Sequence, residues 1–215
     1  HIVDRYSPDI AVSCSFGAPE GMVILDMLKN ISSEFRICTI DTGRLPQATY
    51  DLMDKIHEKY NYKVDVIYPD YNVLQELVES KGMNCFYESV ENRKECCYIR
   101  KVAPFNVYLK TKGIRAIVSG LRQEQSAERS NTRMIELDKY ENCAKINPIF
   151  DWTKEEVMTY IDNHGVPTNQ LHKEGYESVG CEPCSRAGAG RSGRWWWEHE
   201  DVPKECGLHE HGSGI

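Results

Sequence analysis

The chain has 215 residues, of which 40% are hydrophobic and 27% charged, with 33 acidic against 26 basic side chains. A chain of this length and composition can bury its own core, which excludes the disordered and collagen-like classes and makes a disulfide scaffold unnecessary. Because the net charge is −7 and no apolar stretch approaches the roughly 20 residues of a membrane helix, we expect a soluble, cytoplasmic protein that binds neither nucleic acid nor membranes.

Short apolar runs in the first 120 residues are typical of buried parallel strands. They are residues 10–15, 35–41, 64–68 and 116–120, each flanked by Gly, Pro or charged residues. Apolar residues at spacings of three and four predict amphipathic helices between them, at residues 22–28, 50–60 and 73–79. This alternation predicts an α/β fold with a doubly wound, mostly parallel sheet over residues 1–164. Ligands of such a sheet bind beyond the carboxyl ends of its strands.

A different composition begins after the last predicted helix. Thr153 and Glu156 form a capping-box pattern, which predicts a helix that ends near His164 and Gly165. Residues 165–215 show no helical or strand periodicity and are rich in Gly, Cys, Arg, His and Trp. We expect this loop-rich C-terminal segment to fold back on the same domain or to be held by a metal.

Four of the nine cysteines form two tight pairs. Cys96 and Cys97 are adjacent, and Cys181 and Cys184 have C-x-x-C spacing, so together they offer four soft sulfur ligands for zinc or an iron-sulfur cluster. Adjacent side chains point in different directions, and single-zinc sites use wider spacings, so the first pair favours a cluster of several irons. In the alternative interpretation, the first pair is buried and inert and the second is a disulfide or redox pair.

Cys206 lies apart from these pairs, near the chain end. With Lys204 and His209 close to it in the sequence, its thiol is expected to be exposed and partly ionised, as a nucleophile requires. A cysteine without a role is the alternative. The remaining cysteines lie singly in apolar or mixed runs and are expected to be buried, inert thiols: Cys14, Cys38, Cys85 and Cys143.

An acidic chain that binds an anion must concentrate positive charge locally, and three clusters do so. They are Arg93, Lys94, Arg100 and Lys101 around the first cysteine pair, Arg122, Arg129 and Arg133 after the strand ending at Gly120, and Arg186, Arg191 and Arg194 after Cys184. Guanidinium groups bind phosphate or sulfate oxygens in pairs. A metal shared by the four cysteines would bring two clusters together, whereas solvated surface charge is the alternative for any one cluster.

Two turns can contribute to the same site. Ser13 to Ala18 leads from the first strand toward a helix, where hydroxyls and backbone N–H groups can cradle a phosphate. The turn has neither the lysine of a P-loop nor the glycines of a dinucleotide fingerprint. Asp41 to Arg44 follows the second strand and is expected to line the same crevice.

With these residues in view, the chain resembles the assimilatory adenylyl-sulfate reductases of the sulfonucleotide reductase family over nearly its whole length. The resemblance rests on Ser13 to Ala18, Asp41 to Leu45, Cys96-Cys97 with Arg100-Lys101-Val102, Gly120-Leu121-Arg122 with Gln125-Ser126, Gly180-Cys181 to Cys184, Arg191 to Trp197, and Glu205 to His209. It implies an adenine nucleotide α-hydrolase-like fold and the reduction of 5′-adenylyl sulfate to sulfite and AMP, with thioredoxin as electron donor.

The resemblance also implies the roles of individual residues. Cys96, Cys97, Cys181 and Cys184 would bind a 4Fe-4S cluster, and Cys206 would be the nucleophile that forms an S-sulfocysteine. The substrate-binding residues would be Ser13, Ser15, Gly17, Ile40, Thr42, Gly43, Lys101, Arg122, Arg191, Arg194 and His209. Relatives that act on the 3′-phosphorylated substrate generally lack the cluster cysteines, so their presence points to adenylyl sulfate.

Three alternatives compete with this interpretation. They are a reductase of the 3′-phosphorylated substrate (PAPS), a zinc-stabilised nucleotide-binding scaffold in which Cys206 is idle, and an adenylating ATP pyrophosphatase. The absence of a Ser-Gly-Gly-x-Asp-Ser loop argues against the last. We expect residues from about Pro203 onward to be mobile, because Cys206 must meet first the substrate and then thioredoxin. The sequence leaves a homo-oligomer open.

Overall fold

The computed structural model describes residues 2–31, 34–137, 143–199 and 201–202. Its α-helices are α1 (Ile2–Tyr6), α2 (Pro19–Leu28), α3 (Gln47–Tyr60), α4 (Tyr71–Lys81), α5 (Val90–Cys97), α6 (Ala103–Lys112) and α7 (Lys154–His164). Its strands are β1 (Ile10–Ser13), β2 (Arg36–Ile40), β3 (Val64–Ile67), β4 (Ala116–Val118), β5 (Ile135–Leu137) and β6 (Ala144–Ile146). No helix in these ranges has the length and apolarity needed to span a membrane.

The strands form one sheet in the order β3-β2-β1-β4-β6-β5. Every neighbouring pair is parallel except β5 and β6, which are antiparallel. The chain moves outward from β1 to β3 on one side and then crosses to β4 on the other, so the strand order reverses beside β1. Ligands of doubly wound sheets bind at this point of reversal, outside the carboxyl ends of the strands.

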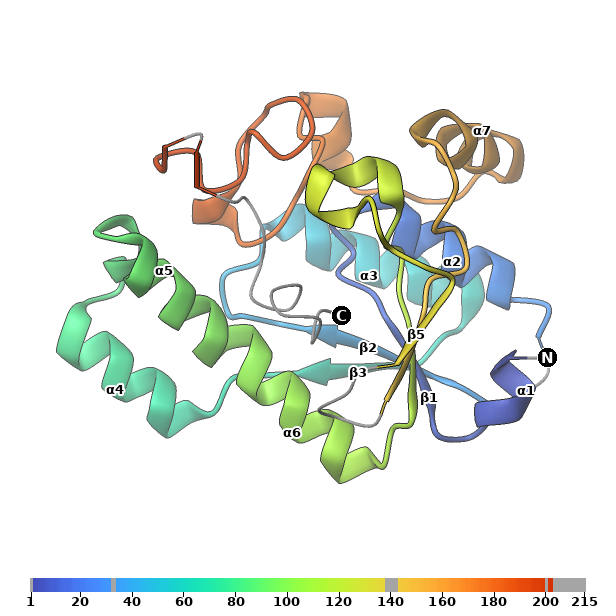
Figure 1. Cartoon of the computed structure of the whole chain (residues 1–215), viewed down its shortest axis with the longest axis horizontal. Helices are drawn as coiled ribbons and strands as arrows, with labels where there is room; N and C mark the ends of the chain where they lie inside the picture. Colours follow the sequence, from blue (N-terminus) through green and yellow to red (C-terminus); the bar gives the residue numbers. More distant parts are fainter. Residues whose placement is uncertain (1, 32–33, 138–142, 200, 203–215) are drawn as a thin grey trace.

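Alternating side chains of the strands build a core on each face of the sheet. Ile10 and Val12 of β1 pack with buried residues of α2, α3 and α7, whereas Ala11 packs on the opposite face with Phe105 and Leu109 of α6. Figure 1 shows α2, α3 and α7 on one side of the sheet and α4, α5 and α6 on the other. The predicted doubly wound α/β architecture is therefore confirmed.

The predicted elements are present with small changes in their bounds. The four predicted strands are β1, β2, β3 and β4, each shorter than its apolar run, and the predicted helices are α2, α3, α4 and α7. The capping box of α7 is confirmed, because Thr153 Oγ1 accepts a hydrogen bond from Glu156 N at 3.1 Å and Glu156 Oε2 accepts one from Thr153 N at 2.7 Å. Gly165 ends this helix in the left-handed conformation, with φ +57°.

Besides the short helix α1, four elements were not predicted: strands β5 and β6 and helices α5 and α6. Strands β5 and β6 have three residues each, too few for a visible alternation, and buried β6 carries Lys145 at its centre. Helices α5 and α6 are joined by a π-helical turn, Tyr98–Val102, which interrupts the regular spacing of apolar residues. Cys96 and Cys97 are the last two residues of α5, so a helix rather than a loop presents the first cysteine pair.

The described part of the C-terminal segment contacts the turns at the carboxyl ends of the strands. Asn169 Nδ2 donates to the carbonyl oxygen of Phe16 at 3.0 Å and to Thr49 Oγ1 at 3.1 Å. Glu182 N donates to the carbonyl oxygen of Arg44 at 2.8 Å. These contacts place residues from both predicted parts of the chain, 1–164 and 165–215, around one site.

Candidate active site

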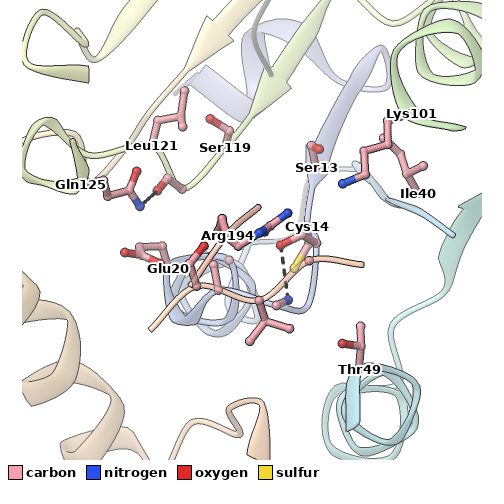
Figure 2. A pocket seen from close by; sticks show the side chains of 18 of the residues that line it. Ser13, Cys14, Glu20, Ile40, Thr49, Lys101, Ser119, Leu121, Gln125 and Arg194 are labelled. Atoms are coloured by element: carbon pink, nitrogen blue, oxygen red, sulfur yellow. Dashed lines mark hydrogen bonds between the residues drawn. The ribbon is translucent and has the colours of Figure 1, made fainter. Parts of the chain in front are cut away.

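A cavity of about 200 Å³ lies beyond the carboxyl ends of β1, β2 and β4 (Figure 2). The predicted substrate-binding residues that line it are Ser13, Ser15, Gly17, Ile40, Thr42, Lys101, Arg191 and Arg194. Gly43 and Arg122 are not among the residues that line this cavity. Cys206 and His209 lie outside the described residues. The structure thus brings together, at the predicted edge of the sheet, residues that are up to 181 positions apart in the sequence.

The turn between β1 and α2 forms one wall of the cavity. Pro19 begins α2, and Ala18 precedes it in an extended conformation without a side-chain cap, so the first N–H groups of the helix lie at the cavity. Such N–H groups favour an anion. A Cβ atom at Gly17 would lie 2.6 Å from the carbonyl oxygen of Val179, so only glycine permits this close approach of the C-terminal segment.

Two cations reach the cavity from different segments. Figure 2 shows Lys101, from the π-helical turn, and Arg194, from the C-terminal segment. Any side chain at Gly180 would overlap the Arg194 guanidinium, so the absence of a Cβ there makes room for this cation. The Nε atom of Arg194 is buried without a hydrogen-bond partner among the described residues. A buried donor of this kind is satisfied by an anionic ligand.

The four predicted ligand cysteines lie together in one small buried cluster. Cys96, Cys97, Cys181 and Cys184 pack with Phe86, Trp195 and Trp197. None of these four thiols forms a disulfide, so the structure does not contain the local Cys181–Cys184 bridge that was an alternative. Thr42 Oγ1 lies 3.2 Å from Cys181 Sγ, which joins the thiol cluster to the lining of the cavity.

Positive charge surrounds these thiols. The pKa of Cys184 is raised to about 12, chiefly by burial and also by neighbouring Cys181, although the charges of Lys101 and Arg194 act to lower it. Burial also raises the pKa of Cys96, while the charge of Arg100 opposes this shift and the nearby Cys181 adds to it. The cations that line the cavity therefore also lie close enough to stabilise thiolates in the cluster.

The four thiols also have the chemistry of ligands for a metal centre. Within the described ranges, no three His, Cys, Asp or Glu side chains converge as ligands of one metal ion. The four thiols nevertheless share one buried site, and the guanidinium of Arg100, whose Nε has no hydrogen-bond partner among the described residues, lies close to Cys96. Four cysteine sulfurs gathered in one buried site are the ligand set that an iron-sulfur cluster requires.

A buried ion pair ties α5 to the C-terminal segment. Arg93 Nε donates to Glu198 Oε1 at 2.9 Å and Arg93 Nη2 donates to Glu198 Oε2 at 3.0 Å, with both side chains almost fully buried. The Arg93 guanidinium also lies 4.6 Å from the centre of the Trp195 ring. This pair fixes the helix that carries Cys96 relative to the turns that carry Arg194. Glu198 was not predicted as a site residue, because its partner Arg93 is 105 positions away in the sequence and no local motif links the two.

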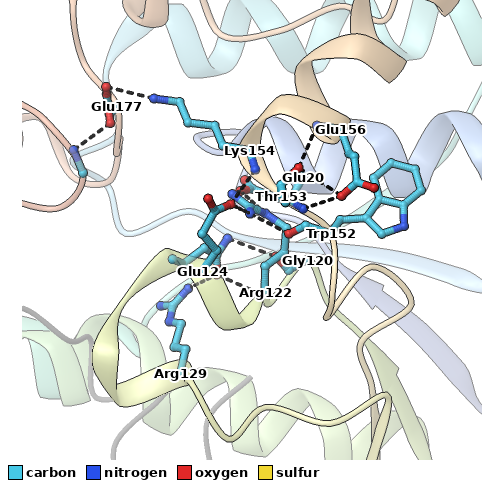
Figure 3. A network of polar contacts seen from close by, with 12 residues as sticks. Glu20, Gly120, Arg122, Glu124, Arg129, Trp152, Thr153, Lys154, Glu156 and Glu177 are labelled. Atoms are coloured by element: carbon cyan, nitrogen blue, oxygen red, sulfur yellow. Dashed lines mark hydrogen bonds and ion pairs between the residues drawn. The ribbon is translucent and has the colours of Figure 1, made fainter.

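Arg122, which was predicted to bind the substrate, lines the second of two neighbouring cavities rather than the first. Its Nε and Nη2 donate to Glu20 Oε1 at 3.0 and 2.8 Å, and its Nη1 donates to Glu124 Oε2 at 3.0 Å and to the carbonyl oxygen of Trp152 at 2.9 Å (Figure 3). Because the Glu20 carboxylate is buried at the start of α2, it requires a cation beside it. Arg122 therefore stabilises the position of Glu20, which lines the first cavity, without lining that cavity itself.

Arg129 is the cation that sequence reasoning grouped with Arg122 but did not select. It lines the cavity, together with Gln125, from two short 3₁₀ turns, Gln123–Gln125 and Ala127–Arg129. Turns of three residues leave no periodic signal in the sequence. The orientation of Arg129 was therefore visible only in the structure.

A second cavity, of about 630 Å³, adjoins the first and shares Arg129 and Arg191 with it. A ligand too large for the first cavity can therefore extend past these two cations. Glu177 fixes the loop next to Arg191, because its Oε2 accepts a hydrogen bond from Gly190 N at 2.7 Å. Its Oε1 forms an ion pair with Lys154 Nζ at 2.9 Å (Figure 3).

Comparisons with known proteins agree with this site. The family described as "Phosphoadenosine phosphosulfate reductase domain" matches residues 9–187. An "Adenosine 5′-phosphosulfate reductase" from Burkholderia cepacia is 42% identical over 196 residues, which cover 89% of this chain and 77% of that protein. A protein of the same name from Allochromatium vinosum is 40% identical over 211 residues, which cover 96% of this chain and 81% of the relative.

Solved structures show the same architecture. A phosphoadenylyl-sulfate (PAPS) reductase from Candida auris, crystallised as a phosphate complex, has a TM-score of 0.72 at 27% identity, covering 85% of this chain and 87% of its own. FMN adenylyltransferase from Candida glabrata, in complex with FAD and pyrophosphate, has a TM-score of 0.62 at 14% identity, covering 86% of this chain and 60% of its own. At that identity the second likeness concerns the fold alone, which is the adenine nucleotide α-hydrolase-like fold.

Proposed function

The chain belongs to the phosphoadenosine phosphosulfate reductase domain family, and from this premise we propose that it reduces adenylyl sulfate to sulfite and AMP in sulfate assimilation. The observation that carries the proposal is the arrangement of Lys101, Arg191 and Arg194 around one cavity, at the point where the strand order of the sheet reverses. Cations from segments far apart in the sequence meet there beside the N-terminus of α2, as a phosphosulfate group requires. The relatives named for this activity support the choice of substrate.

The turns around the cavity would hold the nucleotide. Ser13, Ser15 and Gly17 on one turn, with Ile40 and Thr42 on the other, lie where an adenosine phosphate would meet hydroxyl and N–H groups. Gly43 does not line the cavity, but its N–H donates to Asp41 Oδ1 at 2.8 Å and stabilises the turn that follows β2. We assign Arg122 the same supporting role through Glu20. His209 stays a prediction for the substrate-binding set, from outside the described residues.

The reaction would proceed in two displacements. The Cys206 thiolate attacks the sulfur of the sulfate group, the bond from that sulfur to the bridging oxygen breaks, and AMP leaves with the electron pair, its charge stabilised by Lys101, Arg191 and Arg194. An S-sulfocysteine remains on the enzyme. A thioredoxin thiolate then attacks Cys206 Sγ, sulfite leaves, and the second thioredoxin thiol releases Cys206. The dithiol becomes a disulfide and supplies the two electrons that reduce the sulfur.

We further propose that Cys96, Cys97, Cys181 and Cys184 hold a 4Fe-4S cluster. When bound, the cluster would supply local electrostatic tuning rather than electrons. The four thiols themselves already connect α5 to the C-terminal segment and lie close to Lys101 and Arg194. Anaerobically purified protein should contain four irons and four sulfides per chain and be brown, whereas colourless protein containing zinc would contradict the proposal.

Two broader expectations accompany this function. Residues 1–164 would form the nucleotide-binding domain, and residues 165–215 would fold back on it and carry the nucleophile. The enzyme would act in the cytoplasm as a monomer or homo-oligomer, with neither nucleic acid nor membrane as a partner.

The test is a comparison of two substrates. With reduced thioredoxin present, adenylyl sulfate should yield sulfite and AMP in equal amounts, and the 3′-phosphorylated compound should react at least tenfold less efficiently, a difference of about 1.4 kcal/mol in transition-state stabilisation. Preference for the 3′-phosphorylated compound would favour the alternative reductase. No sulfite from either compound would favour the scaffold.

A further inference from the structure

An exposed aromatic surface lies beside the cysteine cluster. We define the aromatic face by Met83, Tyr87, Arg186 and Trp196. The side chains of Met83, Tyr87 and Trp196 are 62%, 39% and 40% exposed, and Arg186 is also exposed. Neither the proposed reaction nor the cluster uses any of these side chains. Exposed Trp, Tyr, Met and Arg side chains in one patch are the composition of a protein-binding surface.

Edge-to-face and tilted ring contacts hold the aromatic face in place. The ring of half-buried Trp197 lies 4.4 Å from that of Tyr87, 5.7 Å from that of Trp196 and 5.8 Å from that of buried Phe86, centre to centre. The Arg186 guanidinium lies 4.6 Å from the centre of the Trp196 ring. A partner that binds these side chains would not need to order them first, which lowers the entropic cost of binding.

Hydrogen bonds connect the aromatic face to the cysteine segment. Tyr87 Oη donates to the carbonyl oxygen of Pro183, which lies between Cys181 and Cys184, at 3.1 Å. Arg44 Nη1 donates to the carbonyl oxygen of Met83 at 2.6 Å. The aromatic face is therefore a fixed part of the site rather than a distant patch.

The aromatic face also lies next to the point where the chain leaves toward Cys206. Two turns follow directly from it, since Glu198 N donates to the carbonyl oxygen of Trp195 at 3.0 Å and Val202 N to that of His199 at 3.2 Å. Cys206 is four residues beyond Val202. Four residues span at most about 14 Å. A protein that attacks Cys206 must therefore reach within that distance of the end of these turns.

We propose that the aromatic face is the docking surface for the protein dithiol that reduces the Cys206 intermediate. This inference rests on the proposed function and names the surface that its second step uses. The occupant is a thioredoxin-class protein with an apolar surface around its reactive thiol and hydrogen-bond acceptors for Arg186. Docking there would bring its thiolate to Cys206 Sγ, where the new S–S bond forms, the bond to the SO3 group breaks and sulfite leaves with the electron pair.

The test separates docking from chemistry by using two reductants. Trp196→Ala, Arg186→Glu and Met83→Glu should each raise the KM for reduced thioredoxin about tenfold or more, as for central interface residues. Turnover with dithiothreitol should stay within twofold of the wild type, because a small thiol needs no docking surface. Tyr71→Ala is the matched control, since Tyr71 is an exposed aromatic residue on α4 that lies outside the aromatic face.

Three results would overturn the proposal. The first is an unchanged KM for thioredoxin in both Arg186→Glu and Met83→Glu, which alter exposed side chains only. The second is an equal loss of turnover with both reductants, which would indicate a damaged site. The third is a change of oligomeric state in these variants, which would assign the aromatic face to a second copy of the chain. If wild-type protein formed no SO3 adduct without reductant, the proposed function itself would fail instead.

Discussion

Two arginines of this site lie in different environments, which differ in whether a carboxylate lies beside the guanidinium. Arg122 is buried against Glu20 and Glu124, so its charge is neutralised within the protein. Arg194 lines the cavity, and no carboxylate in the described ranges pairs with it. A guanidinium without a carboxylate partner is the one that can bind an anionic substrate. We therefore expect Arg194 to bind the substrate and Arg122 to stabilise the protein, because among the described residues only Arg122 of the two has an acidic side chain buried beside it.

The supporting role of Arg122 predicts a loss of stability. Arg122→Met should lower the free energy of unfolding by about 3–5 kcal/mol, because it leaves the buried Glu20 carboxylate unpaired. Urea denaturation at pH 7 measures this change. The double variant Glu20→Gln with Arg122→Met should recover most of the loss, since neither charge then remains. A single variant within about 1 kcal/mol of the wild type would mean that Arg122 is free to act on the substrate instead.

The positions of the cysteines in the sequence were a better guide to which residues lie together than the positions of the arginines were. Cys96 and Cys97 pack with Cys181 and Cys184 in the structure, and two tight pairs of cysteines are easily recognised in a sequence. The residue pattern placed Arg122 and Arg129 in one cluster, and the family resemblance selected Arg122 alone. The carboxylate that pairs with Arg122 is 102 positions away in the sequence, so the pattern could not reveal it.

At the scale of elements, Asp26 joins three helices. Its fully buried carboxylate on α2 accepts hydrogen bonds from Tyr60 Oη of α3 at 2.7 Å and from Tyr160 Oη of α7 at 2.9 Å, and it lies 3.0 Å from Lys29 Nζ. Burial acts to raise the pKa of Asp26, but the hydrogen bonds from Tyr60, Lys29 and Tyr160 lower it by more, so its net shift is downward.

The direction of this shift predicts a stability profile. A carboxyl group whose pKa is depressed by folding contributes stability above its unfolded value of about 3.9, and this contribution is lost as the pH falls through the folded value. The wild type should therefore be more stable than Asp26→Asn at pH 6, and the difference should shrink below about pH 4. Urea denaturation of both proteins across this range measures it. A difference that stays constant down to pH 3 would contradict the assignment.

The loop that carries Arg191 depends on Glu177. Glu177→Ala removes both the acceptor for Gly190 N and the ion pair with Lys154, so Arg191 loses its position, and the KM for adenylyl sulfate should rise roughly threefold to tenfold. Glu177→Gln keeps an acceptor for Gly190 and should retain more of the affinity. Steady-state kinetics of both variants test this prediction.

Glu174 provides the control for that experiment. Glu174→Ala changes an exposed carboxylate three residues away and should leave the KM unchanged. Equal effects of Glu174→Ala and Glu177→Ala would show that lost negative charge, rather than a displaced loop, causes the change.

Whole elements were predicted where they are long and periodic. The four central strands and helices α2, α3, α4 and α7 follow from apolar spacing. The π-helical turn Tyr98–Val102 does not, yet it directs Lys101 into the cavity while Arg100 Nη1 donates to the carbonyl oxygen of Thr42 at 2.6 Å. A wide turn of this kind depends on tertiary contacts, so local sequence cannot predict it.

At the scale of the molecule, the topology of the sheet creates the site. Because β1 lies between β2 and β4, the turns that follow these three strands meet at one edge, and the C-terminal segment closes over them. The alternation of strands and helices predicted this edge. The way in which the segment packs on it could not be predicted, since it depends on close contacts such as that of Gly17 with Val179, which no periodicity encodes.

The central claim is that Cys206, which lies outside the described residues, takes the sulfur of adenylyl sulfate as a covalent intermediate. Mass spectrometry of the intact protein after mixing with adenylyl sulfate, without reductant, tests this claim directly. One SO3 unit should be added to the wild type, peptide mapping should place it on Cys206, and Cys206→Ser should stay unmodified. A wild type without the adduct, or an adduct that persists in Cys206→Ser, would contradict the account.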